Sequence, residues 1–353
     1  MRNIVRWVDL AQKLSYRFSF RQDRPVEFLL ISTGGAAHLV FLAAQLERFR
    51  LALGGPDVPL VILTRHDAGA ASFLFDGRAE IMTVDMERLG DESGYRANQL
   101  GTMYQSHFKG IVSLDYHRHP YLDEALVKAA QRPAMAMRPA ALAGLDAVLA
   151  ENASLYQDQF DSGLVGTPIP LRWAAFGTHL SADDPGLPAA TPYDLSDDLL
   201  PEPAAIERPT VVLQPFSPDV SCQPSADFYG SVLDAVPDDH QVSLLGSPEL
   251  LERTPKIKAL LERPNVALEN TDLARALPMM LAARLVIAVE SAPMHLAAIS
   301  GVPTLGIVAD EGNGDVLPYP LEGGPAKARI LLGCGDDAAS AEVAASSVRE
   351  MLN

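Results

Sequence analysis

The polar residues from 290 to 295 follow an apolar run at 285–289 and have the clearest chemical potential in the sequence. Ser291 suits the cap of a short helix, and Pro293 suits its first turn, where a backbone N–H has no partner within the helix. The unpaired N–H groups and the dipole of such a helix attract anions such as phosphates. Glu290 is suited to accept hydrogen bonds from sugar hydroxyls, and His295 to donate to an oxygen or to orient the loop.

A second polar cluster, at residues 115–120, follows another apolar run. If this segment is extended, Asp115, His117 and His119 point to one side, an arrangement that would bind Zn²⁺ or supply an acid and a base. A plain loop at the end of a strand explains the same pattern. The residues alone leave these alternatives open.

Alternating apolar runs and helical patterns indicate how these loops are held in the first half. Strands are expected at 27–32, 58–63, 80–84 and 111–114, and helices at 36–53, 67–75, 93–108, 121–131 and, as one long element, 139–160. This order predicts a mostly parallel, doubly wound sheet.

The second half repeats the alternation. Strands are expected at 210–213, 241–245, 266–268, 285–289 and 304–308, with helices at 226–236, 248–262, 272–283 and 293–300. Ligands of open α/β sheets bind beyond the carboxyl ends of the strands, so both polar clusters lie where a site is expected.

These patterns predict an α/β protein with two Rossmann-like doubly wound domains that face a central cleft. We expect an amphipathic segment at 1–24, an N-terminal domain at 25–180, a linker rich in Pro, Asp and Ala at 181–209, a C-terminal domain at 210–338 and a closing helix at 339–353. The length of 353 residues suits two such domains.

Composition excludes several classes of protein. A net charge of -17 argues against a general nucleic-acid binder, because phosphate backbones are held by clustered Lys and Arg. No apolar stretch is long enough to span a bilayer. Cys222 and Cys334 form neither a disulfide framework nor a metal motif, which favours a reducing compartment, the cytoplasm.

The first 24 residues are basic and amphipathic in an acidic protein. Their apolar side chains recur at helical spacing, and the basic side chains mark another face: Ile4, Trp7, Val8, Ala11, Leu14 and Phe18 against Arg2, Arg6, Lys13 and Arg17. One interpretation is packing on the protein's own body. The other is peripheral contact with an anionic membrane surface, at the inner face of the membrane.

Residues 284–308 resemble the signature D-S-G-P-M-H-L-A-A-A-L-G-V-P-T of the family 9 glycosyltransferases, the ADP-heptose:lipopolysaccharide heptosyltransferases and their relatives. Glu290 stands at the Asp of that signature and Ala292 at its first Gly. The matching positions are Ser291, Pro293, Met294, His295, Leu296, Ala297, Ala298, Gly301, Val302, Pro303 and Thr304. Looser similarities lie at 244–249, 273–285 and 111–136.

The resemblance implies a GT-B fold and an inverting, metal-independent transfer of a sugar from a nucleotide donor, ADP-linked in this family, with no cofactor. It places the donor on the second domain, at Glu290, Ser291, Ala292, Pro293, Met294, His295 and Ser217. It places the acceptor on the first domain, at Gly34, Gly35, Asp115, His117, Arg118 and His119.

Two positions depart from the family pattern. The first glycine loop of the family carries an Asp that is the candidate base, whereas this chain has Gly34-Gly-Ala-Ala-His38. His38 is therefore the candidate base, since an imidazole titrates near neutrality; the alternative is a surface or packing role. The loop at 214–224 lacks the cation of the family, and Ser217, Ser221 and Gln223 are its neutral hydrogen-bond donors.

The sequence thus predicts a glycosyltransferase that moves a heptose or hexose to a glycan or protein acceptor. The alternatives are a catalytically degenerate binding or scaffold protein with the same fold and, more remotely, a sugar-nucleotide epimerase.

Overall fold

The computed structural model describes residues 27–163, 166–182, 186–217, 223–308, 319, 324–333 and 335–353. The chain divides into two compact units, unit 1 up to Ala190 and unit 2 from Thr191. The boundary lies within the expected linker. The amphipathic segment 1–24, Ser221 and both cysteines lie outside the described residues.

Unit 1 is built on a six-stranded parallel sheet with the order β3-β2-β1-β4-β5-β6. In register, Leu29 of β1 lies between Val61 of β2 and Ile111 of β4. The strands are β1 Phe28–Ser32, β2 Leu60–Arg65, β3 Glu80–Val84, β4 Gly110–Ser113, β5 Ala134–Met137 and β6 Asp158–Phe160.

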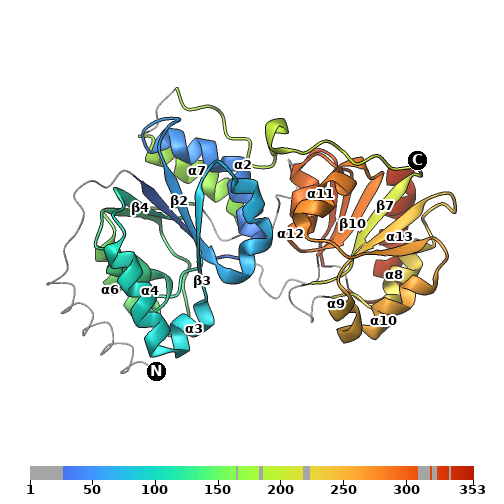
Figure 1. Ribbon diagram of the computed structural model, residues 1–353, viewed down its shortest axis with the longest axis horizontal. Helices are drawn as coiled ribbons and strands as arrows, with labels where there is room; N and C mark the ends of the chain where they lie inside the picture. The colour runs from blue at the N-terminus through green and yellow to red at the C-terminus, as the bar shows by residue number, and fades with distance from the viewer. Residues whose placement is uncertain are drawn as a thin grey trace. The chain divides into compact units, whose positions relative to one another are not determined.

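Helices cover both faces of this sheet, as Figure 1 shows for the pair α2 and α7 and for α4 and α6. All five residues of β1 are buried, as expected of a central strand in a parallel sheet. The helices are α2 Ala36–Ala52, α3 Met86–Asp91, α4 Ser93–Gln105, α5 Asp123–Ala130, α6 Asp146–Asn152 and α7 Ile169–Leu180, with 3₁₀ turns η2 His66–Phe75 and η3 Ala153–Leu155.

Unit 2 repeats the same plan, with the sheet order β12-β11-β10-β7-β8-β9. Its strands are β7 Thr210–Gln214, β8 Gln241–Leu245, β9 Val266–Glu269, β10 Leu285–Val289, β11 Thr304–Ile307 and β12 Ala328–Leu331. Its helices are α8 Ala226–Leu233, α9 Pro248–Arg253, α10 Pro255–Lys258, α11 Leu273–Ala282, α12 Ala292–Ile299 and α13 Ala338–Leu352, with 3₁₀ turns η4 Asp197–Leu199 and η6 Ala259–Glu262.

Each unit has its own hydrophobic core. Leu29, Leu63 and Leu126 are buried in unit 1, and Leu213, Ile287 and Val348 are buried in unit 2. The two sheets therefore form separate folding cores.

The single long helix predicted at 139–160 is wrong. The chain instead forms α6, η3 and the strand β6, preceded by a turn in which Gly144 has a φ of 76°. The backbone N–H of Ala140 donates to the carbonyl of Tyr116 at 2.8 Å, which holds this segment against the loop after β4. The alanine-rich pattern suits a helix, but these tertiary bonds decide the conformation.

Much of the expected linker belongs to unit 2. The N–H of Leu195 donates to the carbonyl of Ile299 in α12, and that of Ala204 to the carbonyl of Pro278 in α11, each at 2.8 Å. These bonds fix the segment against two helices. Among the described residues, no helix combines the length and apolar character needed to cross a membrane.

Candidate functional site

Each sheet reverses its strand order at one point, and the predicted site residues lie there. In unit 1 the reversal is between β1 and β4, which end beside Thr33 and Asp115. In unit 2 it is between β7 and β10, which end beside Gln214 and Glu290. Ligands of open α/β sheets bind at such points, because the loops diverge and leave a crevice.

His38 and Asp115, which the sequence assigned to different roles, form a pair in unit 1. His38 Nδ1 lies 3.6 Å from Asp115 Oδ1, and the side chains are 23% and 3% exposed. The imidazole also packs edge-on against Trp173 of α7, whose Nε1 donates to the carbonyl of Leu114 at 2.7 Å. The partly exposed imidazole therefore has a buried carboxylate behind it, as a general base requires.

The glycines at positions 34 and 35, before α2, are each favoured by a different structural requirement. A Cβ on residue 34 would lie 1.8 Å from Nδ1 of His38, so Gly34 leaves the space that the imidazole occupies. Gly35 is the N-cap residue of α2 and has a φ of 94°, a conformation that side chains disfavour. The predicted contact of Gly34 and Gly35 with an acceptor stays a prediction.

The loop after β4 does not hold Asp115, His117 and His119 on one side, as an extended chain would. Asp115 is buried, His117 is exposed, and His119 is half-buried with Nδ1 accepting the N–H of Tyr121 at 3.3 Å. Burial lowers the pKa of His119. Among the described residues, no group of three His, Cys, Asp or Glu side chains is arranged to hold a metal ion.

Arg118 points into unit 1. Its Nη1 donates to the carbonyls of Asp115 and Met137 at 3.1 and 2.6 Å, its Nε lies 3.5 Å from Glu124 Oε1, and its guanidinium lies over the ring of Tyr156. Both side chains of the Arg118 and Glu124 pair are fully buried. This burial disfavours direct contact between Arg118 and an acceptor and gives the residue a role in holding the loop.

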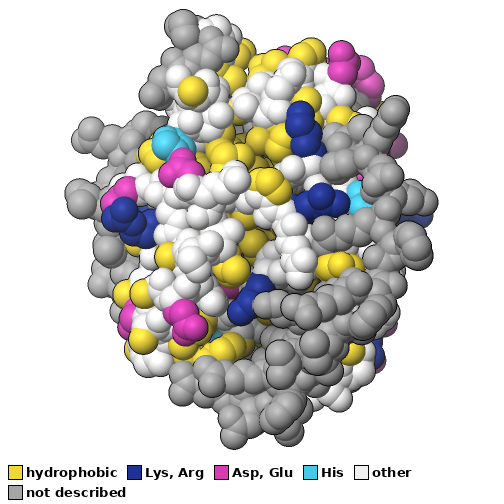
Figure 2. All heavy atoms as spheres, turned by 90° about the vertical axis from the view of Figure 1, so that its left-hand side faces the viewer, with side chains coloured by type: hydrophobic (Ala, Val, Ile, Leu, Met, Phe, Trp, Pro, Cys, Tyr) yellow, Lys and Arg dark blue, Asp and Glu magenta, His cyan; other side chains and the backbone are white. Residues whose placement is uncertain are grey.

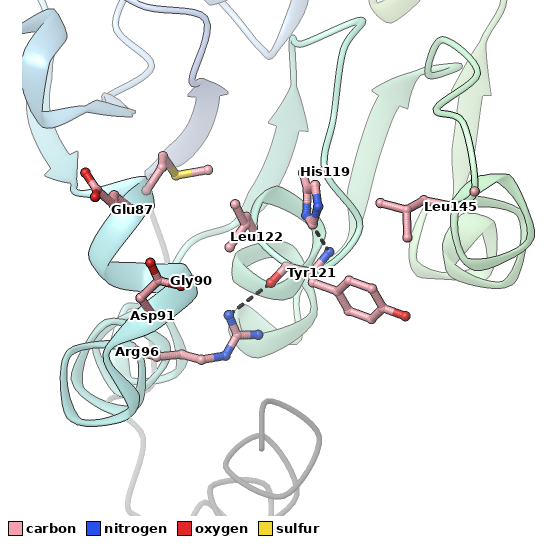
Figure 3. A pocket seen from close by; sticks show the side chains of 10 residues that line it. Glu87, Gly90, Asp91, Arg96, His119, Tyr121, Leu122 and Leu145 are labelled. Carbon is pink, nitrogen blue, oxygen red and sulfur yellow. Dashed lines mark hydrogen bonds between the residues drawn. The ribbon is translucent and has the colours of Figure 1, made fainter. Parts of the chain in front are cut away.

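A cavity of about 530 Å³ opens beside His119 (Figure 3). Met86, Gly90 and Leu122 line it, with Glu87 and Asp91 on α3 and Arg96 on α4, whose Nη1 donates to the carbonyl of Tyr121. Its walls come largely from segments that follow β3, β4 and β5. It therefore lies at the carboxyl ends of the parallel strands, as His38 does after β1.

The molecular face in Figure 2 brings hydrophobic side chains to the surface along its middle. Basic and acidic side chains are interspersed around them there rather than segregated. This face therefore shows no broad basic surface among its described residues.

In unit 2, Glu290 follows β10 and α12 begins two residues later. Glu290 is an exposed residue, but the surrounding protein removes part of the water around its carboxyl and so raises the pKa of that group. In the first turn of α12, the N–H groups of Ala292 and Met294 have no acceptor within the helix, and Pro293 has no N–H. This turn has the groups needed to bind an anion.

Ser291 is the N-cap residue of α12, but its side chain does not cap the helix. Its Oγ lies 2.7 Å from the carbonyl of Val289 and 3.1 Å from Oε1 of Gln214. The Nε2 of Gln214 donates to the carbonyl of Phe216 at 2.8 Å. Ser291 therefore ties the turn after β10 to the loop after β7, where Ser217 is half-buried.

His295 lies within α12 and is 2% exposed. Its Nδ1 lies 2.9 Å from the hydroxyl of Tyr319, and that ring packs edge-on against Tyr193. Burial first, then Tyr193 and the charge of Glu290, raise the pKa of Tyr319. The sequence did not single out either tyrosine, because each lies in a stretch without periodic pattern.

The structure also brings Thr33 and Asp123 to the His38 pair, and the sequence did not identify them. Thr33 Oγ1 lies 3.0 Å from Asp115 Oδ2 and 2.6 Å from Asp123 Oδ1. Nothing in the spacing of these residues indicated the contact, which depends on the pairing of β1 with β4.

Comparison with known proteins finds a match to a family model over part of the chain and a shared fold. Residues 167–320 match the model of glycosyltransferase family 9 (heptosyltransferase). No curated protein matches the sequence. The crystal structure of the glycosyl transferase family 9 from Veillonella parvula DSM 2008 is 14% identical with a TM-score of 0.64, over 93% of this chain and 90% of that one.

Two Escherichia coli structures are similar over most of their length. E. coli heptosyltransferase WaaC with ADP is 13% identical with a TM-score of 0.68, over 92% of this chain and 99% of that one. E. coli ADP-heptose lps heptosyltransferase II is 14% identical with a TM-score of 0.60, over 92% and 98%. With the two parallel sheets, these similarities confirm the expected GT-B type of α/β fold.

Proposed function

We propose that this chain, whose residues 167–320 match the model of glycosyltransferase family 9, transfers a heptose or hexose from an ADP-linked donor to an acceptor hydroxyl, with inversion and without a metal ion. The observation that carries the proposal is the turn after β10, where the family signature, Glu290 and the unpaired N–H groups of α12 coincide.

The donor lies on unit 2 in this proposal. The N–H groups of Ala292 and Met294 bind the diphosphate, which needs few cations because the helix start supplies the positive potential. The carboxylate of Glu290 accepts hydrogen bonds from sugar hydroxyls. ADP is chosen because E. coli WaaC is described with ADP and with ADP-2-deoxy-2-fluoro heptose.

The acceptor lies on unit 1. The acceptor oxygen attacks C1 of the sugar, the bond from C1 to the diphosphate oxygen breaks, and the bonding electrons leave with ADP. His38 Nε2 takes the acceptor proton, and Asp115 stabilises the resulting imidazolium. Attack from the side opposite the leaving group inverts C1.

The cavity beside His119 takes part of the acceptor. Its volume of about 530 Å³ lies within the range of small-molecule sites, and it shares an edge of the sheet with His38. His117 lies exposed on the same loop and is accessible to the acceptor, whereas Arg118 is buried and does not reach it.

The donor assignment is tested by calorimetry with ADP and with ADP-heptose. We expect Glu290→Ala to weaken the binding of ADP-heptose about tenfold and that of ADP less than twofold, because the carboxylate contacts the sugar only. Equal losses for both ligands would contradict the role of Glu290. Glu269→Ala, at the end of β9, is the matched control and changes neither affinity.

Activity is tested by following ADP release from ADP-heptose and ADP-hexoses, with and without glycan acceptors, in the presence of a metal chelator. Acceptor-dependent release that survives chelation supports the proposal. Binding of ADP without any release would identify a degenerate binding protein instead, and failure of ADP, UDP and GDP to bind would remove the donor site altogether.

A further inference from the structure

Two buried carboxylates meet at one hydroxyl group behind His38. Thr33 Oγ1 lies 3.0 Å from Asp115 Oδ2 and 2.6 Å from Asp123 Oδ1. The backbone N–H of Thr33 donates to the same Asp115 oxygen at 2.6 Å, and the N–H of His119 donates to Asp123 Oδ2 at 2.7 Å. Asp115 and Asp123 are 2% and 4% exposed.

The hydroxyl of Thr33 has one proton and cannot donate to both carboxylates at once. With two ionised carboxylates, one of these short contacts would bring two electron-rich oxygens together without a proton. A proton on Asp123 resolves the conflict: Asp123 donates to Thr33 Oγ1, and Thr33 donates to Asp115. Burial, then the charge of Asp115, raises the pKa of Asp123 to about 6, so the carboxyl carries this proton in about half of the molecules at pH 6 and in most of them at lower pH.

Asp115 is the carboxylate of the two that faces His38. Its Oδ2 receives the N–H and the hydroxyl of Thr33, while its Oδ1 lies 3.6 Å from His38 Nδ1. Within the described part of the chain, neither Oδ1 nor Nδ1 has a hydrogen-bond partner. The geometry thus leaves one oxygen of Asp115 directed at one nitrogen of His38.

We infer that Thr33 and Asp123 are positioning residues that hold Asp115 so that His38 keeps its proton on Nδ1 and presents Nε2 as a free base. The catalytic meaning of this arrangement rests on the proposed function, whereas the position of the proton on His38 does not. In many catalytic sites a carboxylate beside the nitrogen that does not react fixes the tautomer of the imidazole.

The other charged groups around this set are neutralised among themselves. From the loop after β4, Arg118 donates to the carbonyl of Asp115 and lies 3.5 Å from Glu124 of α5. Asn152 of α6 donates to the second oxygen of Glu124 at 2.8 Å, and Tyr156 lies against Arg118. His119 reaches Asp123 through its backbone N–H, and α7 supplies Trp173 beside His38.

The test is ¹⁵N NMR of the imidazole nitrogens in the full chain, which reports the nitrogen that carries the proton. We expect the Nδ1–H tautomer of His38 in the wild type and its loss in Asp115→Asn. Thr33→Val keeps the shape of the side chain and removes the hydroxyl, so it shifts the tautomer as well. Thr33→Ser retains the hydroxyl and is expected to keep the wild-type tautomer.

Asp123 offers a second matched pair. Asp123→Asn supplies a permanent N–H donor to Thr33 and keeps the tautomer, whereas Asp123→Leu removes the donor and loses it. Where transfer is measurable, we expect kcat to fall about tenfold in Thr33→Val and Asp123→Leu, stay within about twofold in Thr33→Ser and Asp123→Asn, and KM to stay unchanged throughout.

A second histidine pair is the internal control. His179 of α7 contacts Asp158 of β6 at an exposed position, so Asp158→Asn alters the His179 signal and leaves that of His38 unchanged. The inference is overturned if Thr33→Val and Asp123→Leu keep the wild-type tautomer of His38. Absence of sugar transfer in the wild type would instead refute the proposed function and leave the NMR result interpretable.

Discussion

At the scale of single residues, Gly34 shows how closely the His38 pair is fitted. An alanine Cβ there would lie 1.8 Å from His38 Nδ1, so the imidazole has to leave its position beside Asp115. The backbone at Gly34 has no positive φ, so the substitution adds no backbone strain.

We therefore expect Gly34→Ala to lower kcat about 100-fold, the scale of a lost general base, with little loss of stability. Gly35→Ala is the contrasting variant, because its φ of 94° costs an alanine about 1 kcal/mol of folding free energy. Transfer rates and thermal unfolding of both variants check the prediction. Full activity in Gly34→Ala would argue that the imidazole does no chemistry.

Asp123 links the same cluster to the stability of the protein. Its pKa is raised from 3.8 to about 6, so the folded state binds a proton more tightly than the unfolded chain does. The buried charge therefore destabilises the fold above pH 6, and this destabilisation disappears as the pH falls towards 4.

We expect the free energy of unfolding of the wild type, relative to Asp123→Asn, to rise by about 2 kcal/mol between pH 7 and pH 4. Urea denaturation of both proteins across this range measures the difference, in which the other titrating groups cancel. A difference that stays constant with pH would show that Asp123 titrates normally.

The sequence identified some residues of the candidate site and missed others for a physical reason. Glu290 and Ser291 belong to one contiguous turn, so spacing sufficed to place them at the end of β10. His38, in the first turn of α2, and Asp115, in the loop after β4, are 77 residues apart in the sequence, and only the pairing of β1 with β4 brings them together. A contact of this kind leaves no local pattern.

At the scale of elements, the strands that are continuous apolar runs were predictable, and three short strands were not. The strands β1 and β10 are wholly buried and appear as continuous apolar runs. The strand β6 has three residues, none of them fully buried, and β12 is a partly exposed edge strand, so neither has such a run. These two strands and β5, a four-residue strand of Ala and Met, escaped prediction, although the alternation around them indicated the fold class.

The cavity that α3 and α4 form with the loop after β4 leads to a prediction about the acceptor. Leu122→Trp puts a larger ring into this space, beside Gly90. We expect the KM for the acceptor to rise about tenfold, with kcat and the affinity for ADP unchanged, since the substitution fills the cavity that we propose takes part of the acceptor. Leu250→Trp, on the exposed surface of α9, is the control and alters neither constant.

At the scale of the whole molecule, two sheets with the same strand order carry separate cores. A ligand that binds one folded unit stabilises that unit by mass action, by about 2.7 kcal/mol at 100 times its dissociation constant. ADP is therefore expected to raise the unfolding temperature of unit 2 and to leave that of unit 1 unchanged.

Differential scanning calorimetry with and without ADP checks this expectation. Leu126→Ala in the core of unit 1 and Ile287→Ala in that of unit 2, each costing about 3 kcal/mol, assign the two transitions. Leu126→Ala lowers the transition of unit 1. If ADP shifts that transition instead, the nucleotide binds unit 1 and the donor assignment is wrong.

Because Trp173 packs edge-on against the imidazole of His38, its fluorescence is expected to depend on the charge of that imidazole. The chain has two tryptophans, so Trp7→Phe leaves Trp173 as the single indole fluorophore. Protonated imidazole quenches indole emission on contact, so the brightness of that variant follows the charge of His38 in real time. If His38 is the base, as we propose, stopped-flow mixing with substrates reports the arrival of the proton during the first turnover, without any added label.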